Sequence, residues 1–478
     1  MSANAPRLRL LAVDGFERPV HLRLPFRFGV VTLREAPQLF LRARVRLSDG
    51  REGEGVSAEL LVPKWFDKSP ELSNEDNFNQ LRRSVAIAQR HMVGAGERKA
   101  FGISAAANAD HRLECEANGL NGLVASFGIA LIERAIIDAL GRIENKPAAD
   151  LVRTNRLGLD ATLTPDLAGF DLGKFLSGLK PADTIHARHT VGLVDAITRA
   201  DTHGNRLDDG LPESLEEVIA AYGHRYFKLK VGGDLEADIE RLARIASVLD
   251  RAADAYKATL DGNGQYDNVD AVNALWRRIG EDKRLARLKA SMLLIEQPIA
   301  RARALSEPIH ALAGEIAVEI DESDNDFDVF PRARALGYRG ISAKSCKGFY
   351  RALLNSARVA HYHAQGDGHY VMSAEDLTTQ GGVAVQQDLL LASLVGATHV
   401  ERNGHHYVDG MAGAPQAEQD AYLAEHGDLY RRADNGRARL DIKNGALSLR
   451  SLAQTPGLAT AVMPDWNAMR ATPASEQR

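Results

Sequence analysis

The sequence predicts an α/β protein whose main unit is a (β/α)8-type barrel, with an α+β region before it and a short tail after it. Short apolar runs alternate with amphipathic helical stretches at a spacing of roughly 25 to 35 residues, which is typical of a parallel sheet. Eight such runs occur, the number that closes a barrel. The 478 residues are enough for a barrel of about 250 residues and a second domain.

The amino-terminal region, residues 1–182, has the pattern of a small meander followed by helices. Alternate residues from Leu39 to Leu47 are apolar, which predicts a strand with one buried face. The Asp-Gly pair in SDGREGEG (48–55) predicts a hairpin to the next strand. Apolar residues at helical spacing predict a helix over 124–142.

The barrel region is predicted to span residues 183–415. Amphipathic helices, such as 235–250, separate its strands. Catalytic groups of such barrels lie at the carboxyl ends of the strands, so these ends are where we expect a site. The eight candidate strands are 184–193, 226–230, 257–263, 293–298, 317–323, 340–345, 370–376 and 399–404.

The tail, residues 416–478, contains turns and short apolar pieces and does not continue the βα rhythm. We expect it to fold back onto the amino-terminal region. A net charge of -5 gives no basic surplus, which argues against nucleic-acid and membrane partners and favours a small molecule. Two distant cysteines, no signal-peptide core and no long apolar segment predict a soluble cytoplasmic protein.

Charged side chains end five consecutive predicted strands. Each motif alone is common, since KLK is typical of a solvated strand face and DGNG of a turn. Where two such residues lie two positions apart on a strand, period-two alternation places both side chains on the same face. The joint pattern of charged strand ends therefore indicates a site. In chain order the residues are Lys228 with Lys230, Asp261 with Asn263, Glu296, Asp321 and Lys344.

Three carboxylates flanked by lysines suit a hard divalent cation with a base on each side of a substrate. Mg²⁺ prefers oxygen ligands, which Asp261, Glu296 and Asp321 supply. The cation would stabilise the oxyanion that forms when a bound carboxylate loses its α-proton. A lysine base must be neutral, so its pKa must fall by roughly 3 from about 10.4. A second ammonium at Lys228, the cation and burial all lower the pKa of Lys230.

The motifs KLK, DGN, EQP, DES and AKSCKG, in this order, resemble the enolase superfamily and within it the muconate-lactonizing-enzyme subgroup. The superfamily is known for pairing a lysine or histidine base with Mg²⁺. FGIALIERAIIDALGR resembles the segment before the family's barrel, and PGLATAVMPDW resembles its returning tail. The resemblance implies that the amino-terminal region and the tail form a capping domain over the barrel mouth.

The resemblance also implies roles for single residues. Asp261, Glu296 and Asp321 would bind Mg²⁺. Lys230 and Lys344 would be acid/base catalysts on opposite faces of the substrate. The remaining implied contacts are electrostatic help from Lys228 and a polar contact from Asn263, and weaker candidates for binding substrate are Glu375, Asp376 and Asn403.

For several other residues the sequence allows two different roles. Lys347, in KSCKGFY where the family often has Gly-Gly, either reaches an anionic substrate group or is a solvated lysine, which we favour. His405 and His406 either touch a ligand or lie on the surface, and we favour the surface. Trp65 and Phe66 either form an apolar lid over the substrate or belong to the core, and we favour the lid. The histidines of TIHARHT, His186 and His189, receive no role.

The sequence therefore predicts a Mg²⁺-dependent enzyme that removes the proton α to a carboxylate and forms a metal-stabilised enediolate. Facing lysines suit a racemase or epimerase, and they also permit cycloisomerisation or β-elimination. The alternatives are an acid-sugar dehydratase and a non-catalytic ligand-binding barrel. In related dehydratases the seventh strand supplies a histidine, whereas this chain has Glu375 and Asp376 there, with His369 at the strand's beginning. The resemblance also implies a homo-oligomer, a dimer or an octamer.

Overall fold

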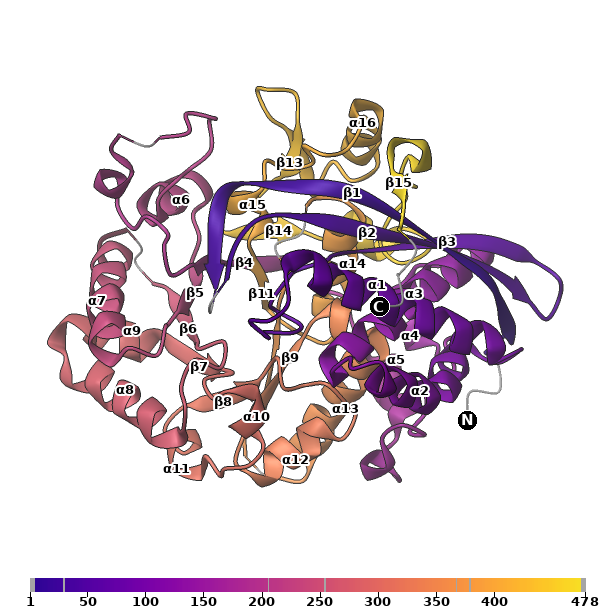
Figure 1. Cartoon of the computed structure of the whole chain (residues 1–478), viewed down its shortest axis with the longest axis horizontal. Helices are drawn as coiled ribbons and strands as arrows, with labels where there is room; N and C mark the ends of the chain where they lie inside the picture. Colours follow the sequence, from indigo (N-terminus) through magenta and orange to yellow (C-terminus); the bar gives the residue numbers. More distant parts are fainter. Residues whose placement is uncertain are drawn as a thin grey trace.

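Two large sheets organise the chain (Figure 1). The computed structural model describes residues 5–28, 31–204, 206–252, 255–366, 368–377 and 380–473. One sheet has four strands in the order β15-β1-β2-β3, and its long strands cross one end of the molecule. The other is a curled sheet of parallel strands in the order β10-β9-β8-β7-β6-β5-β4-β11. A further antiparallel strand, β14, pairs with β4.

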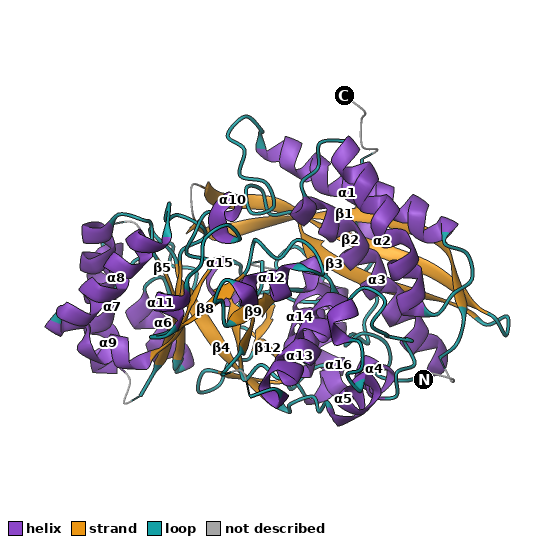
Figure 2. Cartoon of the chain, turned by 90° about the horizontal axis from the view of Figure 1, so that it is seen from below, coloured by secondary structure: helices purple, strands orange, loops and turns teal. Residues whose placement is uncertain are grey.

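The first sheet is an antiparallel meander of β1 (Leu8–Phe28), β2 (Val31–Leu47) and β3 (Glu52–Leu60). The predicted hairpin joins β2 to β3. Helices α1 (Asn74–Gly94), α2 (Ala100–Ala117) and α3 (Gly122–Glu144) cover one face of the sheet (Figure 2). A Cβ at Gly55 of β3 would lie 2.2 Å from the backbone of Ala135 and Ala139, so glycine allows α3 to pack this closely.

Helix α3 extends two residues beyond the predicted helix at each end. Asn121 caps its amino end by accepting hydrogen bonds from the main-chain N–H groups of Leu123 and Val124. Asn145 ends it in the left-handed conformation, with φ of 51°. Most of the helix between these residues is buried, because it lies between the meander and α1.

The eight parallel strands of the curled sheet correspond one to one to the eight predicted strands. They are β4 (Thr184–Val191), β5 (Tyr226–Lys230), β6 (Lys257–Asp261), β7 (Met292–Glu296), β8 (Ala317–Ile320), β9 (Gly340–Ala343), β10 (Val371–Ala374) and β11 (His399–Arg402). All neighbouring pairs along the sheet are parallel. The end strands β10 and β11 also contact one another, although the described residues form no ladder between them.

Seven of the eight strands end earlier than predicted, at the carboxyl ends where the predicted site residues lie. Asn263 after β6 and Gln297 after β7 have positive φ angles of 43° and 34°. This conformation turns the backbone out of the ladder. Several site residues therefore stand just beyond a strand rather than inside it: Asp321, Lys344 and Glu375 each follow the last strand residue.

Helices alternate with these strands and cover the outside of the curl (Figure 2). They are α6 (Leu215–Tyr222), α7 (Leu235–Ala252), α8 (Val269–Glu281), α9 (Ala286–Ser291), α10 (Arg301–Ala304), α11 (His310–Ala313), α12 (Val329–Ala335), α13 (Phe349–Ala364), α14 (Val383–Leu394) and α15 (Gly404–Tyr407). Shorter elements before and between them are α4 (Ala148–Arg153), α5 (Leu172–Gly178), η1 (Pro165–Leu167), η2 (Arg199–Thr202), η3 (Lys283–Leu285) and η4 (Ser345–Lys347).

The tail contacts both sheets. Strand β15 (Arg470–Ala471) pairs with β1, as expected for a segment that returns to the amino-terminal region. Strand β14 (Ala446–Ser448) pairs instead with β4 of the curled sheet. The other tail elements are α16 (Gln416–Glu425), β12 (Tyr430–Arg432), β13 (Ala438–Leu440), α17 (Arg450–Gln454) and η5 (Trp466–Ala468). The domain boundaries at 182/183 and 415/416 stay a prediction.

Two large hydrophobic clusters form the core. One joins the amino-terminal sheet, helices α1–α3, the tail and the side of the curled sheet that contains β9, β10 and β11. The other lies between strands β5–β8 and helices α7–α9. Within the described ranges, every helix is too short or too polar to span a bilayer.

Candidate active site

The two lysines of β5 point into the curl of the sheet, where Lys228 is the centre of a carboxylate cluster. Its Nζ lies 2.9 Å from Asp261 Oδ2, 2.7 Å from Glu296 Oε2, 2.5 Å from Glu375 Oε2 and 2.9 Å from Glu401 Oε2. The residue is 1% exposed. A buried ammonium is stable only beside opposite charge, which these four carboxylates provide.

Lys230 and Lys344 flank this cluster from different strands. Lys230 Nζ donates to Asp261 Oδ2 and, at 2.8 Å, to Asn263 Oδ1. Lys344 Nζ lies 2.5 Å from Asp321 Oδ2 and 4.0 Å from Glu296 Oε1. Strands β6, β7 and β8 separate β5 from β9 in the sheet, so the two lysines approach from opposite sides.

A cavity that opens to solvent lies over these residues. The curled sheet and its loops supply the polar wall, and the amino-terminal region supplies an apolar wall. The polar wall is Lys228, Lys230, Asn263, Lys344, Asp376, Glu401 and Asn403, with Leu377 beside them, and the apolar wall is Phe26, Phe28, Val62 and Trp65.

The carboxylates carry more negative charge than the lysines balance. Asp261, Glu296 and Asp321 are all 0% exposed. Burial, together with the charges of Asp261 and Glu375, holds the pKa of Glu296 well above its ordinary value. Burial raises the pKa of Glu375 to about 8 and that of Glu319 to about 7. A divalent cation would relieve this repulsion, so the residues fit a metal with oxygen ligands.

The detailed arrangement of the acidic groups differs from the predicted ligand set. Lys228 links Asp261 to Glu296, and Lys344 links Glu296 to Asp321. The compact acidic group in the described residues is Glu296, Glu319 and Glu375, whose ligand oxygens lie within 4.8 Å of one another. Glu296 therefore belongs both to the predicted set and to this group.

The surroundings of Lys228 and Lys344 favour the protonated ammonium, whereas a base must be unprotonated. Burial disfavours the ammonium of Lys228, but Asp261 and Glu296 outweigh burial and raise its pKa well above the ordinary value. Burial also opposes the ammonium of Lys344, whose pKa the Asp321 carboxylate raises. Lys228 thus keeps its charge, which the surrounding carboxylates compensate.

Of the residues predicted to contact substrate, some line the cavity and one lies in the layer beneath its wall. Asn263 accepts from Lys230 and donates to Glu322 Oε1 at 3.1 Å. Asn403 Nδ2 donates to Asp376 Oδ1 at 3.0 Å and to Glu401 Oε1 at 2.9 Å. Asn263, Asp376 and Asn403 line the cavity. Their contact with substrate stays a prediction.

Glu375 lies beneath the cavity wall rather than in it. Its Oε1 accepts from Arg188 of β4, and its Oε2 accepts from Lys228. Arg402 of β11 pairs in the same way with Asp376. These two ion pairs join β4 and β11 to the segment that follows β10.

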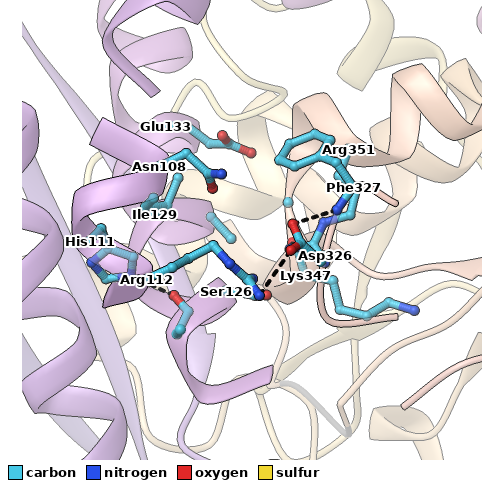
Figure 3. Close-up of a pocket in the computed structure, with 13 residues that line it drawn as sticks. Asn108, His111, Arg112, Ser126, Ile129, Glu133, Asp326, Phe327, Lys347 and Arg351 are labelled. Carbon is cyan, nitrogen blue, oxygen red and sulfur yellow. Dashed lines mark hydrogen bonds and ion pairs between the residues drawn. The ribbon is translucent and has the colours of Figure 1, made fainter. Parts of the chain in front are cut away.

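The preferred interpretation of Lys347 as a solvated lysine is wrong. The residue is 2% exposed, and its Nζ lies 3.1 Å from Asp321 Oδ1 and 3.0 Å from Ser342 Oγ. The 3-10 helix η4 follows β9 directly and turns Lys347 back under the strand. Lys347 also borders a separate pocket of about 340 Å³, across which Arg112 reaches Asp326 at 3.0 Å (Figure 3).

The preferred surface position of His405 and His406 is also wrong, because both are buried on α15. Trp65 and Phe66 both belong to the hydrophobic core, with ring centroids 4.7 Å apart. Trp65 also lines the cavity, with its ring 4.7 Å from Lys344 Nζ, and its role as a lid stays a prediction. Phe66 packs against Phe127 in the core, with ring centroids 5.2 Å apart. Phe26 and Phe28 also line the cavity, and residues 29–30 lie outside the described residues.

Sequence reasoning missed several buried charged residues of the inner face, among them Arg188, Glu319 and Glu401. It considered only the residues at the strand tips. Glu319 precedes Asp321 by two residues, and Glu401 precedes Asn403 by two. Side chains two residues apart share a face of a strand, so the same periodicity could have identified both.

Comparison with known proteins identifies the class to which this fold and site belong. The family described as enolase C-terminal domain-like, of the mandelate racemase and muconate lactonizing enzymes, matches residues 210–466. This match covers more than half of the chain. The chain therefore belongs to the enolase superfamily, in agreement with the resemblance seen in its motifs. Among curated protein sequences, none matches the chain.

Solved structures of similar fold share few identical residues with this chain. The 2-chloromuconate cycloisomerase of Rhodococcus opacus 1CP is 18% identical, with a TM-score of 0.59 over 96% of this chain and 98% of that one. A muconate lactonizing enzyme from Mucobacterium Smegmatis, complexed with muconolactone, is 19% identical, with a TM-score of 0.58 over 97% and 100%. An enolase from Bradyrhizobium, complexed with magnesium and mandelic acid, is 17% identical, with a TM-score of 0.59 over 96% and 97%.

Proposed function

We propose that this chain is a Mg²⁺-dependent enzyme that removes the proton α to the carboxylate of a small substrate, as a racemase or epimerase or as a cycloisomerase. The observation that carries the proposal is that Lys230 and Lys344 enter one cavity from β5 and β9. Each contacts its own carboxylate, Asp261 or Asp321. The eight parallel strands would act as a closed (β/α)8-type barrel, capped by the β1–β3 sheet and helices α1–α3.

Asp261, Glu296 and Asp321 would hold the cation. When bound, Mg²⁺ supplies positive charge that stabilises the anion left by proton removal and lowers the pKa of the neighbouring lysines. The raised pKa of Glu296 supports the assignment, because burial and the neighbouring charges of Asp261 and Glu375 disfavour its ionised form, which a cation would favour. Asp261 and Asp321 remain ionised beside lysines, as ligands of a cation must be.

The two lysines perform the proton transfer. One Nζ, unprotonated, takes the α-proton from one face of the substrate, and the other, as an ammonium, donates a proton to the opposite face. Reversing the roles converts the other enantiomer, as racemisation requires. Cycloisomerisation needs only one of them. Phe26, Phe28 and Trp65 line the cavity beside the two lysines.

Hydrogen exchange at the α-carbon tests the proposal. We expect the protein, with Mg²⁺ in D₂O, to introduce deuterium into a member of a panel of N-acylamino acids, dipeptides, lactones and sugar acids. Lys230→Ala and Lys344→Ala should each abolish exchange from one enantiomer and leave exchange from the other detectable. Lys257→Ala, at the exposed beginning of β6, is the matched control and should keep full activity.

The same panel separates the alternatives. A sugar acid that loses water would favour a dehydratase, although the described cavity wall contains no histidine and His369 is exposed at the other end of β10. Ligand binding without exchange across the panel would favour a non-catalytic barrel. If both lysine variants keep exchange from both enantiomers, the assignment of the bases is wrong.

The proposal includes a homo-oligomer, a dimer or an octamer. Light scattering coupled to size-exclusion chromatography measures the mass directly. A mass equal to the 52.0 kDa of one chain would contradict this part.

A further inference from the structure

Three buried histidines from distant parts of the sequence meet on the outer face of the curled sheet. His189 lies on β4, His224 precedes β5, and His405 lies on α15. They are 2%, 1% and 7% exposed. Arg188 and Thr190 on either side of His189 contact Glu375 and Glu401 inside the curl, so His189 faces the opposite way. One ring nitrogen from each histidine lies within 4.8 Å of the other two.

His224 is oriented as a metal-binding histidine would be. Its Nδ1 lies 3.0 Å from the main-chain oxygen of Ala187, which can only accept, so Nδ1 carries the hydrogen. The other nitrogen, Nε2, therefore has a free lone pair. This atom is buried and has no hydrogen-bond partner. Metal-bound histidines usually donate their second N–H to a carbonyl or carboxylate in this way.

The other two imidazoles already stand at a distance suited to a shared ion. His189 Nδ1 and His405 Nε2 are 3.1 Å apart. Tetrahedral Zn²⁺ with Zn–N bonds of about 2.0–2.1 Å separates its nitrogen ligands by about 3.3 Å.

We propose that His189, His224 and His405 form a second metal site, which binds Zn²⁺ or another divalent transition-metal ion that prefers imidazole. Mg²⁺ prefers oxygen ligands, which this histidine triad does not offer. The inner carboxylates and the outer histidines would thus select different ions by ligand type. Burial holds all three imidazoles in the neutral form that metals bind, since it lowers the pKa of each.

The surroundings of the histidine triad are compatible with a cation. The nearby guanidinium of Arg402 is paired with Asp376, and that of Arg23 is paired with Asp209. His405 also borders a small pocket, together with Tyr222 and Tyr430. Three protein ligands leave a fourth position, which a water molecule in this pocket could take.

Metal binding would join three segments that are far apart in the sequence. α15 follows β11, whose residues Glu401 and Arg402 belong to the inner charge network. Holding α15 against β4 and the start of β5 would therefore stabilise the strand ends that carry the proposed active site. Because a bound ion stabilises only the folded chain, Zn²⁺ should also raise the unfolding temperature.

Metal analysis of the untagged protein tests this proposal. The chain is stripped with a chelator, dialysed against Zn²⁺ in the presence of excess Mg²⁺, and analysed by mass spectrometry of the metal. We expect one Zn²⁺ per chain and an X-ray absorption spectrum with three nitrogen ligands at about 2.0–2.1 Å. Co²⁺ in place of Zn²⁺ should show the ligand-field absorption of a tetrahedral site.

Two ligand variants locate the ion. His224→Gln and His405→Gln should each weaken Zn²⁺ binding by at least about 100-fold, since even loss of a group that supports a ligand costs about 10–100-fold. His21→Gln, at an exposed histidine of β1, is the matched control and should bind as the parent does. Asp321→Asn should also keep Zn²⁺, which separates this site from the inner carboxylates.

Three results would overturn the proposal: no retained Zn²⁺, a spectrum dominated by oxygen ligands, or unchanged affinity in both ligand variants. Circular dichroism establishes whether each variant is folded. If a variant does not fold, the absorption spectrum of the parent protein still decides the question, because it reports the ligands directly. None of these measurements depends on the proposed enzymatic reaction.

Discussion

The two faces of the curled sheet hold their buried ionisable groups in opposite states. On the inner face Lys228 remains charged among carboxylates such as Glu296 and Glu401. On the outer face His189 and His224 are neutral, because burial lowers the pKa of His189 well below its usual range and that of His224 to about 4. Arg188 and His189 are adjacent on β4, yet Arg188 pairs with Glu375 inside the curl whereas burial keeps His189 neutral. A buried group keeps its charge only where opposite charge is in contact with it.

The largest effect is expected from removing the central inner charge. Lys228→Met leaves several buried carboxylates without their shared ammonium, so the free energy of unfolding should fall by about 3–5 kcal/mol. Denaturant titration in the absence of divalent ions measures it. Lys257→Met, at an exposed lysine, should change the value by no more than about 0.5 kcal/mol. Equal effects of the two substitutions would show that the inner cluster does not need Lys228.

A buried histidine away from both faces gives a reference for neutral imidazoles. Burial lowers the pKa of His111 from 6.5 to about 4. Because the unfolded chain then binds a proton that the folded chain does not, stability should fall as the pH drops from 6.5 to 4. The difference in pKa corresponds to about 3 kcal/mol.

Denaturant titrations at several pH values measure this loss. His111→Gln should flatten the dependence of the unfolding free energy on pH in that range. His21→Gln, at an exposed histidine, should leave the dependence unchanged. A parallel curve for His111→Gln would mean that the imidazole of His111 titrates normally in the folded protein.

Metal selectivity tests whether the two faces act separately. Mg²⁺ at about 100 times its dissociation constant should raise the free energy of unfolding by about 2.7 kcal/mol. Glu296→Gln should remove this stabilisation because it deletes a central inner carboxylate, whereas His224→Gln should keep it. Thermal unfolding with and without Mg²⁺ measures both. Loss of the Mg²⁺ effect in the histidine variant would mean that the faces are coupled.

The smallest effect is expected at the apolar wall of the cavity. Trp65→Leu keeps an apolar side chain but removes the ring beside Lys344 Nζ. A cation–π contact of up to about 2 kcal/mol corresponds to a fall in kcat/KM of up to about 30-fold. Steady-state kinetics with the substrate found by deuterium exchange measures it. Trp65→Phe should keep most of the activity, and a Phe variant as impaired as the Leu variant would point to shape instead of the cation–π contact.

Much of the curled sheet could be predicted because its strands are apolar runs at regular spacing. All eight strands occur, and β5 has the predicted bounds. The errors lie at the carboxyl ends, where Asn263 and Gln297 leave the ladder in a conformation that propensities do not reveal. The long strand β1 was not identified, because its polar and apolar residues alternate irregularly and its partner β2 decides its structure.

The candidate site could be predicted in part for a similar reason. The charged strand ends, from Lys228 to Lys344, could be recognised from the sequence because five consecutive buried strands rarely all end in charged residues. The burial of Lys347 was not visible, since the turn of η4 determines where its side chain goes. The histidine triad joins residues 189, 224 and 405, a set that no local pattern connects.

The sequence by itself determined which parallel strands of the curled sheet exist, their order along the chain and which residue types stand at their ends, because these depend on periodicity within a few residues. Only the tertiary structure decided which of those residues share a cluster. Lys228 meets Glu375 and Glu401 because the sheet curls and brings its end strands together. His189 meets His224 and His405 because the opposite face of β4 is covered by α15 and the start of β5. Charge state follows from those contacts, since burial and the nearest opposite charge set each pKa.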